Sequence, residues 1–403
     1  MSARETEGKC RNGKGALDFL TMKADTELPT CDVVIPARNA ERYIIDAIQS
    51  ILCQSHAASQ ILVVNDRSTD GTASAAAAFG SRVQILEGKG RGAGIARNLG
   101  VRHSTSELVA FLDADDVCHP DRLKLQAEAL HNEPQAAMVF CDAEYTDASG
   151  RPTGSLFTFP EYRKEVFLGQ LFERNRILTT SVVAVRRSAF HAVGGFDENL
   201  LHTEDYDLWL RFAQSSRVEH VARPMVYYRM HDSNISSNRE AFRLWEIETL
   251  KKHALQDIHA AFLATHGNAA KADLELSRVL FRMERYEEGE SLLRGVSAEG
   301  SDRTLCHFML GNFAVKRGDH DTAAENYLLC LQCDPGFAPA HNNLGVIAAA
   351  AGRYQQSLEH FARAMELRPG YADPRRNIEA LQQGRLPDLR CTLAPLRTVL
   401  RPE

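Results

Sequence analysis

The chain has 403 residues, which exceeds the roughly 250–300 residues at which a single hydrophobic core stops growing, so we expect two domains. Hydrophobic residues make up 44% and charged residues 25%, values close to globular averages, which argues against a wholly disordered or fibrous chain. The formal net charge of −6 gives no global reason to expect a nucleic-acid partner, because nucleic-acid binders usually present a strongly basic face.

The first residues, 1–28, are polar and show little periodicity, and we interpret them as a flexible leader. They lack the apolar core of a secretory signal, so we expect a cytoplasmic protein. The sequence contains no transmembrane segment, because no stretch approaches the roughly 20 apolar residues that span a bilayer, and this leaves at most peripheral membrane association. The odd number of cysteines, nine, is typical of reduced thiols in such a compartment.

From Cys31 onward, short apolar or β-branched runs alternate with helix-length segments. The predicted strands read CDVVIP, QILVVND, RVQIL and LVAFLDAD, and segment 41–54 carries apolar residues on one helical face. This alternation is typical of a parallel α/β sheet. An extension of the sheet is predicted beyond it, with strands over 136–143, 179–185 and 218–230 and one helix over 204–214.

After about Ala261 the strand signals stop and a 34-residue self-similarity begins. Three sets of residues align at this period: Leu276, Leu310 and Leu344; Tyr286, His320 and Tyr354; and Pro335 with Pro369. The period and the residue types resemble the tetratricopeptide repeat, in which helix pairs bury their apolar faces by stacking on their neighbours. The first copy is the weakest, because Glu284 stands where the later copies have glycine.

Three aspartates lie within four positions at the end of the strand LVAFLDAD: Asp113, Asp115 and Asp116. Open α/β sheets bind ligands at the carboxyl ends of their strands. Carboxylates so close together repel one another unless a cation neutralises them, and oxygen ligands favour Mg²⁺ or Mn²⁺. Taken alone, the cluster is explained equally well by a solvated turn.

Five segments occur in the order and spacing of family 2 glycosyltransferases: VVIPARNAERYIIDAIQSIL, ILVVNDRSTDGT, GRGAGIARNLG, FLDADD and TEDYDLWLR. The resemblance covers about residues 31–237. It implies an α/β GT-A fold, a Rossmann-like sheet that binds a nucleotide sugar, here followed by an all-α tetratricopeptide-repeat solenoid. It also implies an inverting transferase that moves a sugar, of hexosyl or N-acetylhexosaminyl type, from a nucleotide diphosphate sugar to an acceptor hydroxyl.

The same resemblance assigns the metal site. Asp113 and Asp115 match the DxD motif, in which Asp115 binds Mn²⁺ or Mg²⁺ directly and Asp113 contacts the ribose or a water on the metal. His231, in YYRMHDSNIS, is a further candidate metal ligand, with an ordinary polar-loop role nearly as well favoured. For Asp116 three interpretations stay open: support of a neighbouring ligand, a sugar contact, or the start of a helix.

The nucleotide sugar, a UDP-sugar on this resemblance, is expected to lie against nine residues: Pro36, Ala37, Arg38, Asn39, Glu41, Asp66, Arg97, Asp113 and Ala114. Asp66 can accept the imide N–H of uracil. Asn65 and Arg67 depart from the Asp and Gly that are more usual in the family, which makes the identity of the base less secure.

The acidic pair Glu204 and Asp205 matches the family's catalytic pair, with Asp205 as the general base that deprotonates the acceptor hydroxyl. A capping box that begins at Thr203 would leave an equally acidic sequence at a helix start. Both interpretations are compatible if Thr203 caps the helix while Asp205 catalyses.

Three alternatives are less well supported. A nucleotidyltransferase would carry a glycine-rich loop after the first strand, where this chain reads PARNAERY. A processive membrane synthase would have transmembrane helices and a QxxRW motif. A catalytically inactive tetratricopeptide-repeat adaptor is disfavoured by the presence of Asp113, Asp115 and Asp205.

We therefore predict four parts: the leader over 1–28, a GT-A domain over 29–258, repeats over 259–383 and a tail over 384–403. The repeats are expected to recruit the acceptor or a protein partner. A glycan, a lipid-linked saccharide and a protein all remain possible acceptors in polysaccharide or glycoconjugate synthesis.

Overall fold

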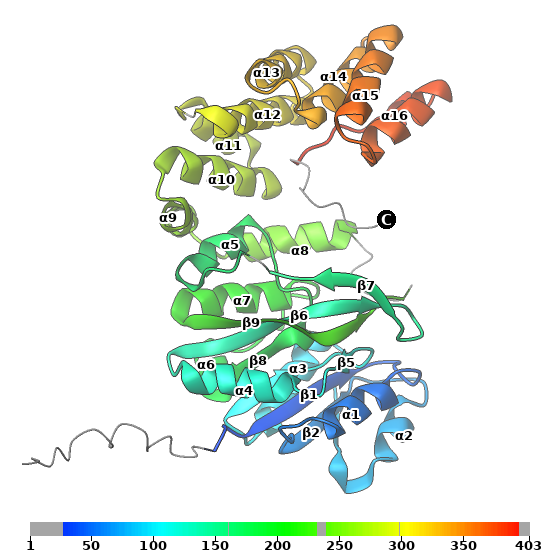
Figure 1. Cartoon of the computed structure of the whole chain (residues 1–403), viewed down its shortest axis with the longest axis vertical. Coiled ribbons are helices and arrows are strands. Elements are labelled where there is room, and N and C mark those ends of the chain that lie inside the picture. The colour runs from blue at the N-terminus through cyan, green and yellow to red at the C-terminus, as the bar shows by residue number, and fades with distance from the viewer. Residues whose placement is uncertain (1–26, 160, 232–238, 298, 395–403) are drawn as a thin grey trace, which may run out of the picture.

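The computed structural model describes residues 27–159, 161–231, 239–297 and 299–394 (Figure 1). The predicted leader lies almost wholly outside the described residues, as does the end of the predicted tail. A sheet with its covering helices forms one end of the molecule, and a stack of helices forms the other. Within the described part of the chain, no helix combines the length and apolar character needed to cross a bilayer.

The sheet is mixed, with strand order β3-β2-β1-β4-β8-β6-β9-β5 and with β7 paired to β6. Strands β1, β2, β3 and β4 run parallel to one another, whereas β8 is antiparallel to both β4 and β6. The strand bounds are β1 (Cys31–Ala37), β2 (Gln60–Asn65), β3 (Gln84–Glu87), β4 (Leu108–Phe111), β5 (Val117–Cys118), β6 (Ala136–Thr146), β7 (Pro152–Phe157), β8 (Val183–Arg186) and β9 (Arg217–Arg229).

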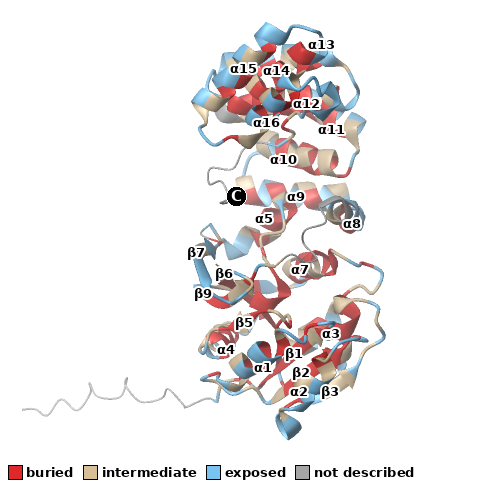
Figure 2. Cartoon of the chain, turned by 90° about the vertical axis from the view of Figure 1, so that its right-hand side faces the viewer, coloured by how far each residue is buried: buried red, intermediate tan, exposed pale blue. Residues whose placement is uncertain are grey.

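Helices cover both faces of the parallel part of the sheet, because its strands are apolar on both sides. Val33 and Ile35 of β1 pack with α1 (Ile44–Leu52), α2 (Thr72–Ala77) and α4 (Arg122–Asn132). The residue between them, Val34, packs on the other face with α3 (Ala93–His103), α6 (Arg187–Ala192) and α7 (Glu204–Ser215). Figure 2 shows the buried residues concentrated along the strands and between the helices of the stack.

Most predicted elements are present, and the differences are local. The first helix begins at Ile44 rather than 41, because the preceding residues form a turn in which the Tyr43 N–H donates to the Ala40 carbonyl at 2.9 Å. Five elements of the sheet half were not predicted: β5, β7, α5 (Phe167–Glu173), α6 and α8 (Arg239–Lys251). All but α8 are too short to show a periodicity, and α8 lies in a stretch for which no element was predicted. Short 3₁₀ turns lie at residues 80–82, 164–166, 180–182 and 386–388.

The repeat pattern is confirmed as three stacked helix pairs and one further helix. The pairs are α10 (Ala269–Arg282) with α11 (Tyr286–Arg294), α12 (Gly300–Lys316) with α13 (His320–Cys333), and α14 (Ala338–Ala350) with α15 (Tyr354–Leu367), followed by α16 (Ala372–Gln382). The second helix of each pair begins at the aligned residue Tyr286, His320 or Tyr354. The predicted fold class, an α/β GT-A sheet followed by an all-α repeat solenoid, is thus confirmed.

Two aligned glycines allow the helices of a pair to approach closely. A Cβ atom on Gly311 would lie 2.5 Å from the ring of Tyr327, and a Cβ atom on Gly345 would lie 2.6 Å from the ring of Phe361. Both aromatic side chains are fully buried. A side chain at either glycine would therefore push the two helices apart.

Glu284 explains why the first repeat is weaker in sequence. It adopts a left-handed backbone conformation with φ of 61°, and the glycines at the aligned positions, Gly318 and Gly352, have φ of 77° and 74°. A non-glycine residue costs roughly 1–2 kcal/mol in this region. The Glu284 carboxylate forms an ion pair with Arg243 on α8 (Arg239–Lys251), which offsets part of that cost.

The first repeat shares the hydrophobic core of the sheet half. Helices α5, α8 and α9 (Leu255–His266) lie between the sheet and the later repeats (Figure 1). Leu276 and Leu280 of α10 belong to the same buried cluster as Phe172 of α5. The predicted domain boundary at 258/259 falls within α9, and the domain limits stay a prediction.

Candidate active site

The central carboxylate of the site is Asp113, which follows β4. Its Oδ1 atom accepts a hydrogen bond from Arg97 Nη2 at 2.6 Å, and its Oδ2 atom accepts one from Thr179 Oγ1 at 2.8 Å. Its backbone N–H donates to Ser181 Oγ at 2.9 Å. Burial acts to raise the pKa of Asp113, but the Arg97 guanidinium and the threonine hydroxyls outweigh burial and hold the pKa below its ordinary value.

A buried arginine fixes the two chain segments that meet at Asp113. Arg122 of α4 donates from Nη2 to the Phe111 carbonyl at 2.9 Å and to the Val183 carbonyl at 3.1 Å. Gln126, one turn later, donates to the Val182 carbonyl at 2.8 Å. Since β4 and β8 are antiparallel neighbours, these bonds keep residues 179–181 opposite the end of β4.

Asp115, one of the predicted metal ligands, lies next to His231, another candidate ligand, and the metal roles of both stay a prediction. The Asp115 Oδ2 and His231 Nε2 atoms are 2.9 Å apart, and the His231 ring stacks on Tyr43 at a centroid distance of 5.1 Å. Burial and the nearby negative charge of Asp113 raise the pKa of Asp115, while His231 acts in the opposite direction.

Asp116 stabilises the loop after β4 that carries Asp113 and Asp115. It is 1% exposed, accepts a hydrogen bond from Ser181 Oγ at 2.6 Å and accepts another from the Arg229 backbone N–H at 3.0 Å. Burial and the charges of Asp115 and Asp113 raise its pKa well above the usual range. These contacts give Asp116 a structural role in the loop that carries Asp115, and its part in binding a ligand stays a prediction.

Arg97 joins the two acidic motifs of the sequence. From α3, its Nη2 atom reaches Asp113 and its Nη1 atom lies 3.3 Å from Glu204 Oε1 on α7. Arg97 is only 5% exposed, whereas the side chain of Asp113 is 27% exposed and so reaches the surface. Burial raises the pKa of Glu204 even though the Arg97 charge opposes it. The structure thus brings Asp113 of the DxD segment and the Glu204–Asp205 pair together around the buried Arg97.

Asp205 has the environment of a group that exchanges a proton near neutral pH. Burial and then the charge of Glu204 raise its pKa to about 7. Its Oδ1 atom accepts a hydrogen bond from the Tyr206 N–H at 2.6 Å. A base is most effective when its pKa lies near the working pH.

The predicted capping box at the start of α7 is wrong, because Thr203 does not cap the helix through its side chain. Thr203 occupies the N-cap position, but its hydroxyl makes no cap hydrogen bond to α7. It donates instead to the Trp245 carbonyl of α8 at 3.1 Å. Asp207 is paired with Arg211 at 2.6 Å and with Lys252, so it holds α7 in place rather than facing the cluster.

The residues predicted to hold the base and ribose lie at the same edge of the sheet but form a separate cluster. Asn39 Oδ1 accepts a hydrogen bond from the Thr69 N–H at 2.8 Å, and Glu41 Oε2 accepts one from the Gly71 N–H at 3.0 Å. Arg38, Asn39 and Glu41 are exposed, whereas Ala37 and Ala114 are buried and Pro36 is half-buried within β1. These contacts tie the loop after β1 to the loop after β2.

Asp66 holds a third loop at this edge. Its Oδ1 atom accepts a hydrogen bond from the Gly90 N–H at 2.6 Å, and its Oδ2 atom accepts one from the Gly92 N–H at 3.1 Å. Both glycines have positive φ, 73° and 113°. Asp66 therefore shapes the loop between β3 and α3, and any uracil contact would use the remaining lone pairs of the same oxygens.

The cluster fits a divalent cation that takes part of its coordination from a bound phosphate. Among the described residues, no group of three or more His, Cys, Asp or Glu side chains forms a complete metal site. Asp115 and His231 offer two converging donors, while both Asp113 oxygens accept hydrogen bonds from Arg97 and the threonines. Mg²⁺ is commonly bound by one or two carboxylates together with substrate phosphates.

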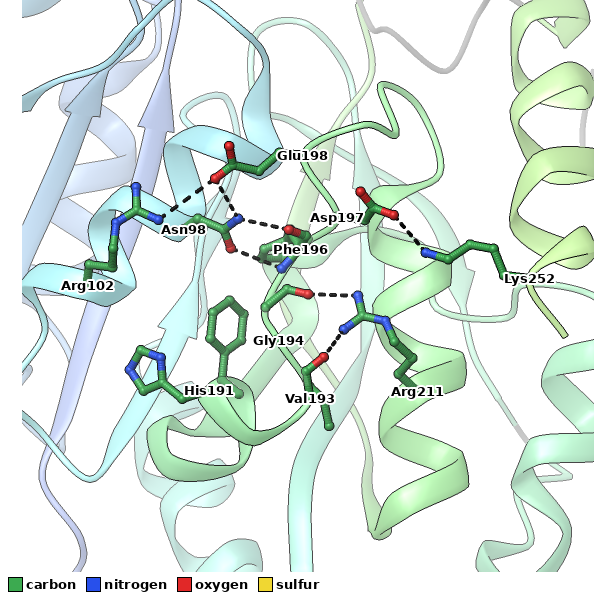
Figure 3. Close-up of a pocket in the computed structure, with 12 residues that line it drawn as sticks. Asn98, Arg102, His191, Val193, Gly194, Phe196, Asp197, Glu198, Arg211 and Lys252 are labelled. Carbon is green, nitrogen blue, oxygen red and sulfur yellow. Dashed lines mark hydrogen bonds and ion pairs between the residues drawn. The ribbon is translucent and has the colours of Figure 1, made fainter.

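A cavity of about 550 Å³ lies on the side of α3 that Asn98 faces (Figure 3). Its lining includes four basic side chains, Arg102, His191, Arg211 and Lys252. Asn98 donates to the Phe196 carbonyl at 2.9 Å across the cavity wall. The predicted site residues do not line this cavity, so the chemistry is assigned to the carboxylate cluster.

Sequence reasoning missed three contributors to the cluster: Thr179, Thr180 and Tyr43. The hydroxyls of Thr179 and Thr180 contact Asp113, and the Tyr43 ring packs against His231 and Arg229. The run TTS at the start of a predicted strand gave no signal, because threonine is common in strands. Its partner across the sheet could not be read from the sequence.

Comparison with known proteins finds a match for each of the two parts of the chain. The model of glycosyl transferase family 2 matches residues 32–194, and a tetratricopeptide-repeat model matches residues 338–371. The first match ends before α7, so it does not include Asp205 or His231.

An uncharacterized glycosyltransferase of Rickettsia typhi is 29% identical over 231 residues, which are 57% of this chain and 72% of that protein. WfgD of Escherichia coli, a UDP-Glc:α-D-GlcNAc-diphosphoundecaprenol β-1,3-glucosyltransferase, is 27% identical over 221 residues, 53% of this chain and 83% of WfgD. The crystal structure of S. aureus TarS 1–349 in complex with UDP has a TM-score of 0.48 and 17% identity, and the match covers 88% of this chain and 92% of TarS 1–349. Residues 32–194 of this chain thus match the glycosyl transferase family 2 model, and a tetratricopeptide-repeat match follows them at residues 338–371.

Proposed function

We propose that this chain is a cytoplasmic inverting glycosyltransferase that moves a hexosyl or N-acetylhexosaminyl group from a UDP-sugar to an acceptor hydroxyl. The observation that carries the proposal is the cluster in which the buried Arg97 joins Asp113 to Glu204, beside Asp205. A diphosphate-binding motif and a candidate base are thereby held in one place. The name of WfgD, which includes UDP-Glc, favours a UDP-sugar as donor.

In the proposed reaction, Asp205 accepts the proton of the acceptor hydroxyl as that oxygen attacks the sugar. A single displacement by one base gives inverted configuration at the sugar carbon. Glu204 sits beside Asp205, and its charge raises the Asp205 pKa and so strengthens the base. Arg97 keeps Glu204 and Asp113 in fixed positions.

Asp115 and His231 would hold the cation, with Asp116 and Arg229 fixing the loop that carries them. The bound Mn²⁺ or Mg²⁺ would supply positive charge to the diphosphate leaving group. The backbone carbonyl of Asp115 accepts a hydrogen bond from Arg229 Nε at 2.9 Å, which orients the Asp115 residue toward His231. The roles of the loop residues Arg38, Asn39, Glu41 and Asp66 toward the nucleotide belong to the same proposal.

The test is a titration of a panel of nucleotide sugars, with and without Mn²⁺, into the full chain and into Asp115→Asn. We expect Mn²⁺-dependent binding of one UDP-sugar that falls at least tenfold in the variant, because the cation loses a charged ligand. Asp321→Asn, an exposed aspartate on α13, is the matched control and should bind like the parent protein. Absence of metal-dependent binding across the panel would refute the proposal and favour an inactive adaptor.

The pH dependence of the reaction follows from the environment of Asp205. Because its pKa is raised to about 7, the carboxylate form needed for proton acceptance is lost as the pH falls below that value. We expect the rate of UDP release from the donor to fall about tenfold per pH unit below about 7, and to level off above it. The measurement is steady-state donor turnover between pH 5.5 and 8.5 at saturating Mn²⁺. A flat profile would contradict the assignment of the base.

A further inference from the structure

Four buried asparagines line one side of the repeat stack. Asn312 lies on α12, Asn342 and Asn343 lie on α14, and Asn377 lies on α16. All four are 0–1% exposed. Asn343 and Asn377 occupy equivalent positions, one 34-residue period apart. Buried amide side chains need hydrogen-bond partners, so something must satisfy them.

Their partner is an extended segment of the same chain. After α16 and the 3₁₀ turn at 386–388, the chain runs back toward α14 and α12 as residues 389–394, which we name the return segment (Figure 1). Asn377 donates to the Arg390 carbonyl at 2.9 Å and accepts from the Arg390 N–H at 2.9 Å. Asn343 does the same for Thr392, at 2.9 Å and 2.7 Å.

These contacts recognise a polypeptide backbone. The side chain of Asn377 hydrogen-bonds to both the N–H and the carbonyl of Arg390. Asn343 makes the same pair of bonds to Thr392, two residues later. Asn312 adds a hydrogen bond to the Leu393 carbonyl at 3.2 Å. Since successive backbone groups in an extended chain point alternately to either side, residues 390 and 392 present their groups in the same direction. An extended segment of almost any sequence would satisfy this row.

A single side chain of the return segment is also recognised. Thr392 Oγ1 donates to Asp373 Oδ2 at 2.7 Å and accepts from Asn342 Nδ2 at 3.2 Å. The hydroxyl of Tyr371 contacts the same oxygen. Three polar groups converge on the hydroxyl of Thr392, a residue that is 7% exposed, so a residue without a hydroxyl would leave buried groups unpaired. We name the surface formed by the four asparagines, Tyr371 and Asp373 the groove. The groove therefore selects serine or threonine at the position of Thr392.

We propose that this groove is a binding site for an extended peptide with serine or threonine at the position of Thr392, and that the return segment is its ligand in cis. The connection from α16 to the segment is short, so the segment has a high effective concentration and keeps the groove closed. A protein partner or protein acceptor with the same backbone and hydroxyl chemistry opens the groove by competition. This proposal does not depend on the sugar-transfer proposal.

The experiment uses a fluorescent peptide with the sequence of residues 388–394, DLRCTLA, added to the full chain under reducing conditions. Thr392→Val removes the recognised hydroxyl from the cis ligand, so we expect the variant to bind the peptide at least fivefold more tightly than the parent chain. A peptide with valine in place of threonine should bind the variant at least fivefold more weakly. Equal affinity of the parent chain and the variant, or no binding to either, would overturn the proposal.

A second pair of variants tests the row of amides. Asn343→Ala, added to Thr392→Val, should weaken peptide binding at least tenfold, because it removes both hydrogen bonds to one residue of the peptide. Asn326→Ala, on α13, is the matched control and should leave binding within twofold, since Asn326 bonds to the Thr322 carbonyl of its own helix. Equal loss in both would overturn the assigned groove.

Hydrogen exchange of the parent chain tests the cis arrangement without any substitution. The amides of Arg390 and Thr392 donate to buried asparagine oxygens, so they should exchange at least tenfold more slowly than in the free peptide. Excess peptide should then accelerate their exchange in the chain. Exchange at the rate of the free peptide would show that the return segment is not a ligand.

Discussion

Replacing Asp205 by asparagine is expected to slow donor turnover by about 10²–10⁴-fold, the usual contribution of a positioned general base, and to leave UDP-sugar binding within about twofold. Asparagine has nearly the same shape as aspartate and can still accept the hydrogen bond from the Tyr206 N–H. It cannot accept the proton of the attacking hydroxyl. The measurement is UDP release at saturating donor and Mn²⁺, together with donor binding by titration.

Asp207→Asn, three residues from Glu204 on the same helix, is the matched control. The Asp207 carboxylate is fully buried and pairs with Arg211 and Lys252, so its loss should lower stability. Folded Asp207→Asn protein should nevertheless turn over donor within about threefold of the parent rate, because this carboxylate touches no reacting group in the proposed mechanism. If Asp207→Asn were as slow as Asp205→Asn, the base would have to be reassigned.

The repeat half was the part most completely predictable from the sequence. Its contacts are local, and each helix pair repeats the same spacing, so Tyr286, His320 and Tyr354 mark the helix starts correctly. Even the irregular position was visible, because Glu284 takes a backbone conformation that the later copies give to glycine. Each repeat of such a stack contacts only its neighbours, so the residue spacing within one repeat is enough to predict where its helices begin.

The candidate site was predictable in its motifs but not in its connections. The sequence separates Arg97 from Glu204 by more than a hundred positions, and nothing in either segment indicates an ion pair between them. The hydroxyls of Thr179 and Thr180 reach Asp113 only because β8 runs antiparallel to β4. Such partners depend on strand order, which periodicity and composition do not determine.

The position of α10 changes how the repeats can be tested. Leu276 and Leu280 pack in the same core as the sheet, and Arg282 of α10 forms an ion pair with Glu246 of α8 at 2.7 Å. A deletion that began at the predicted boundary would remove this packing and expose apolar surface. Any effect on nucleotide binding would then reflect lost stability. The Thr392 and Asn343 variants test the repeats without that complication.

Replacing Arg97 by methionine is expected to lower the free energy of unfolding by about 3–5 kcal/mol, the usual cost of removing one partner from a buried ion pair. Asp113 and Glu204 would both lose their compensating charge in a site where Arg97 is only 5% exposed. The measurement is urea unfolding followed by tryptophan fluorescence. It reports on this region because the chain has two tryptophans, Trp209 on α7 and Trp245 on α8.

Arg102→Met is the matched control. Arg102 lies on the same helix, but its side chain is half exposed and its ion pair with Glu198 is long, at 3.9 Å. Its loss should change stability by no more than about 0.5 kcal/mol. If the Asp113 carboxylate is the group left without compensation, Mn²⁺ with UDP should restore part of the stability of Arg97→Met and none of the small change in Arg102→Met. Equal losses in the two variants would mean that Arg97 acts as an ordinary surface charge. The ion pairs of Arg97 with Asp113 and Glu204 would then contribute nothing measurable to the free energy of unfolding.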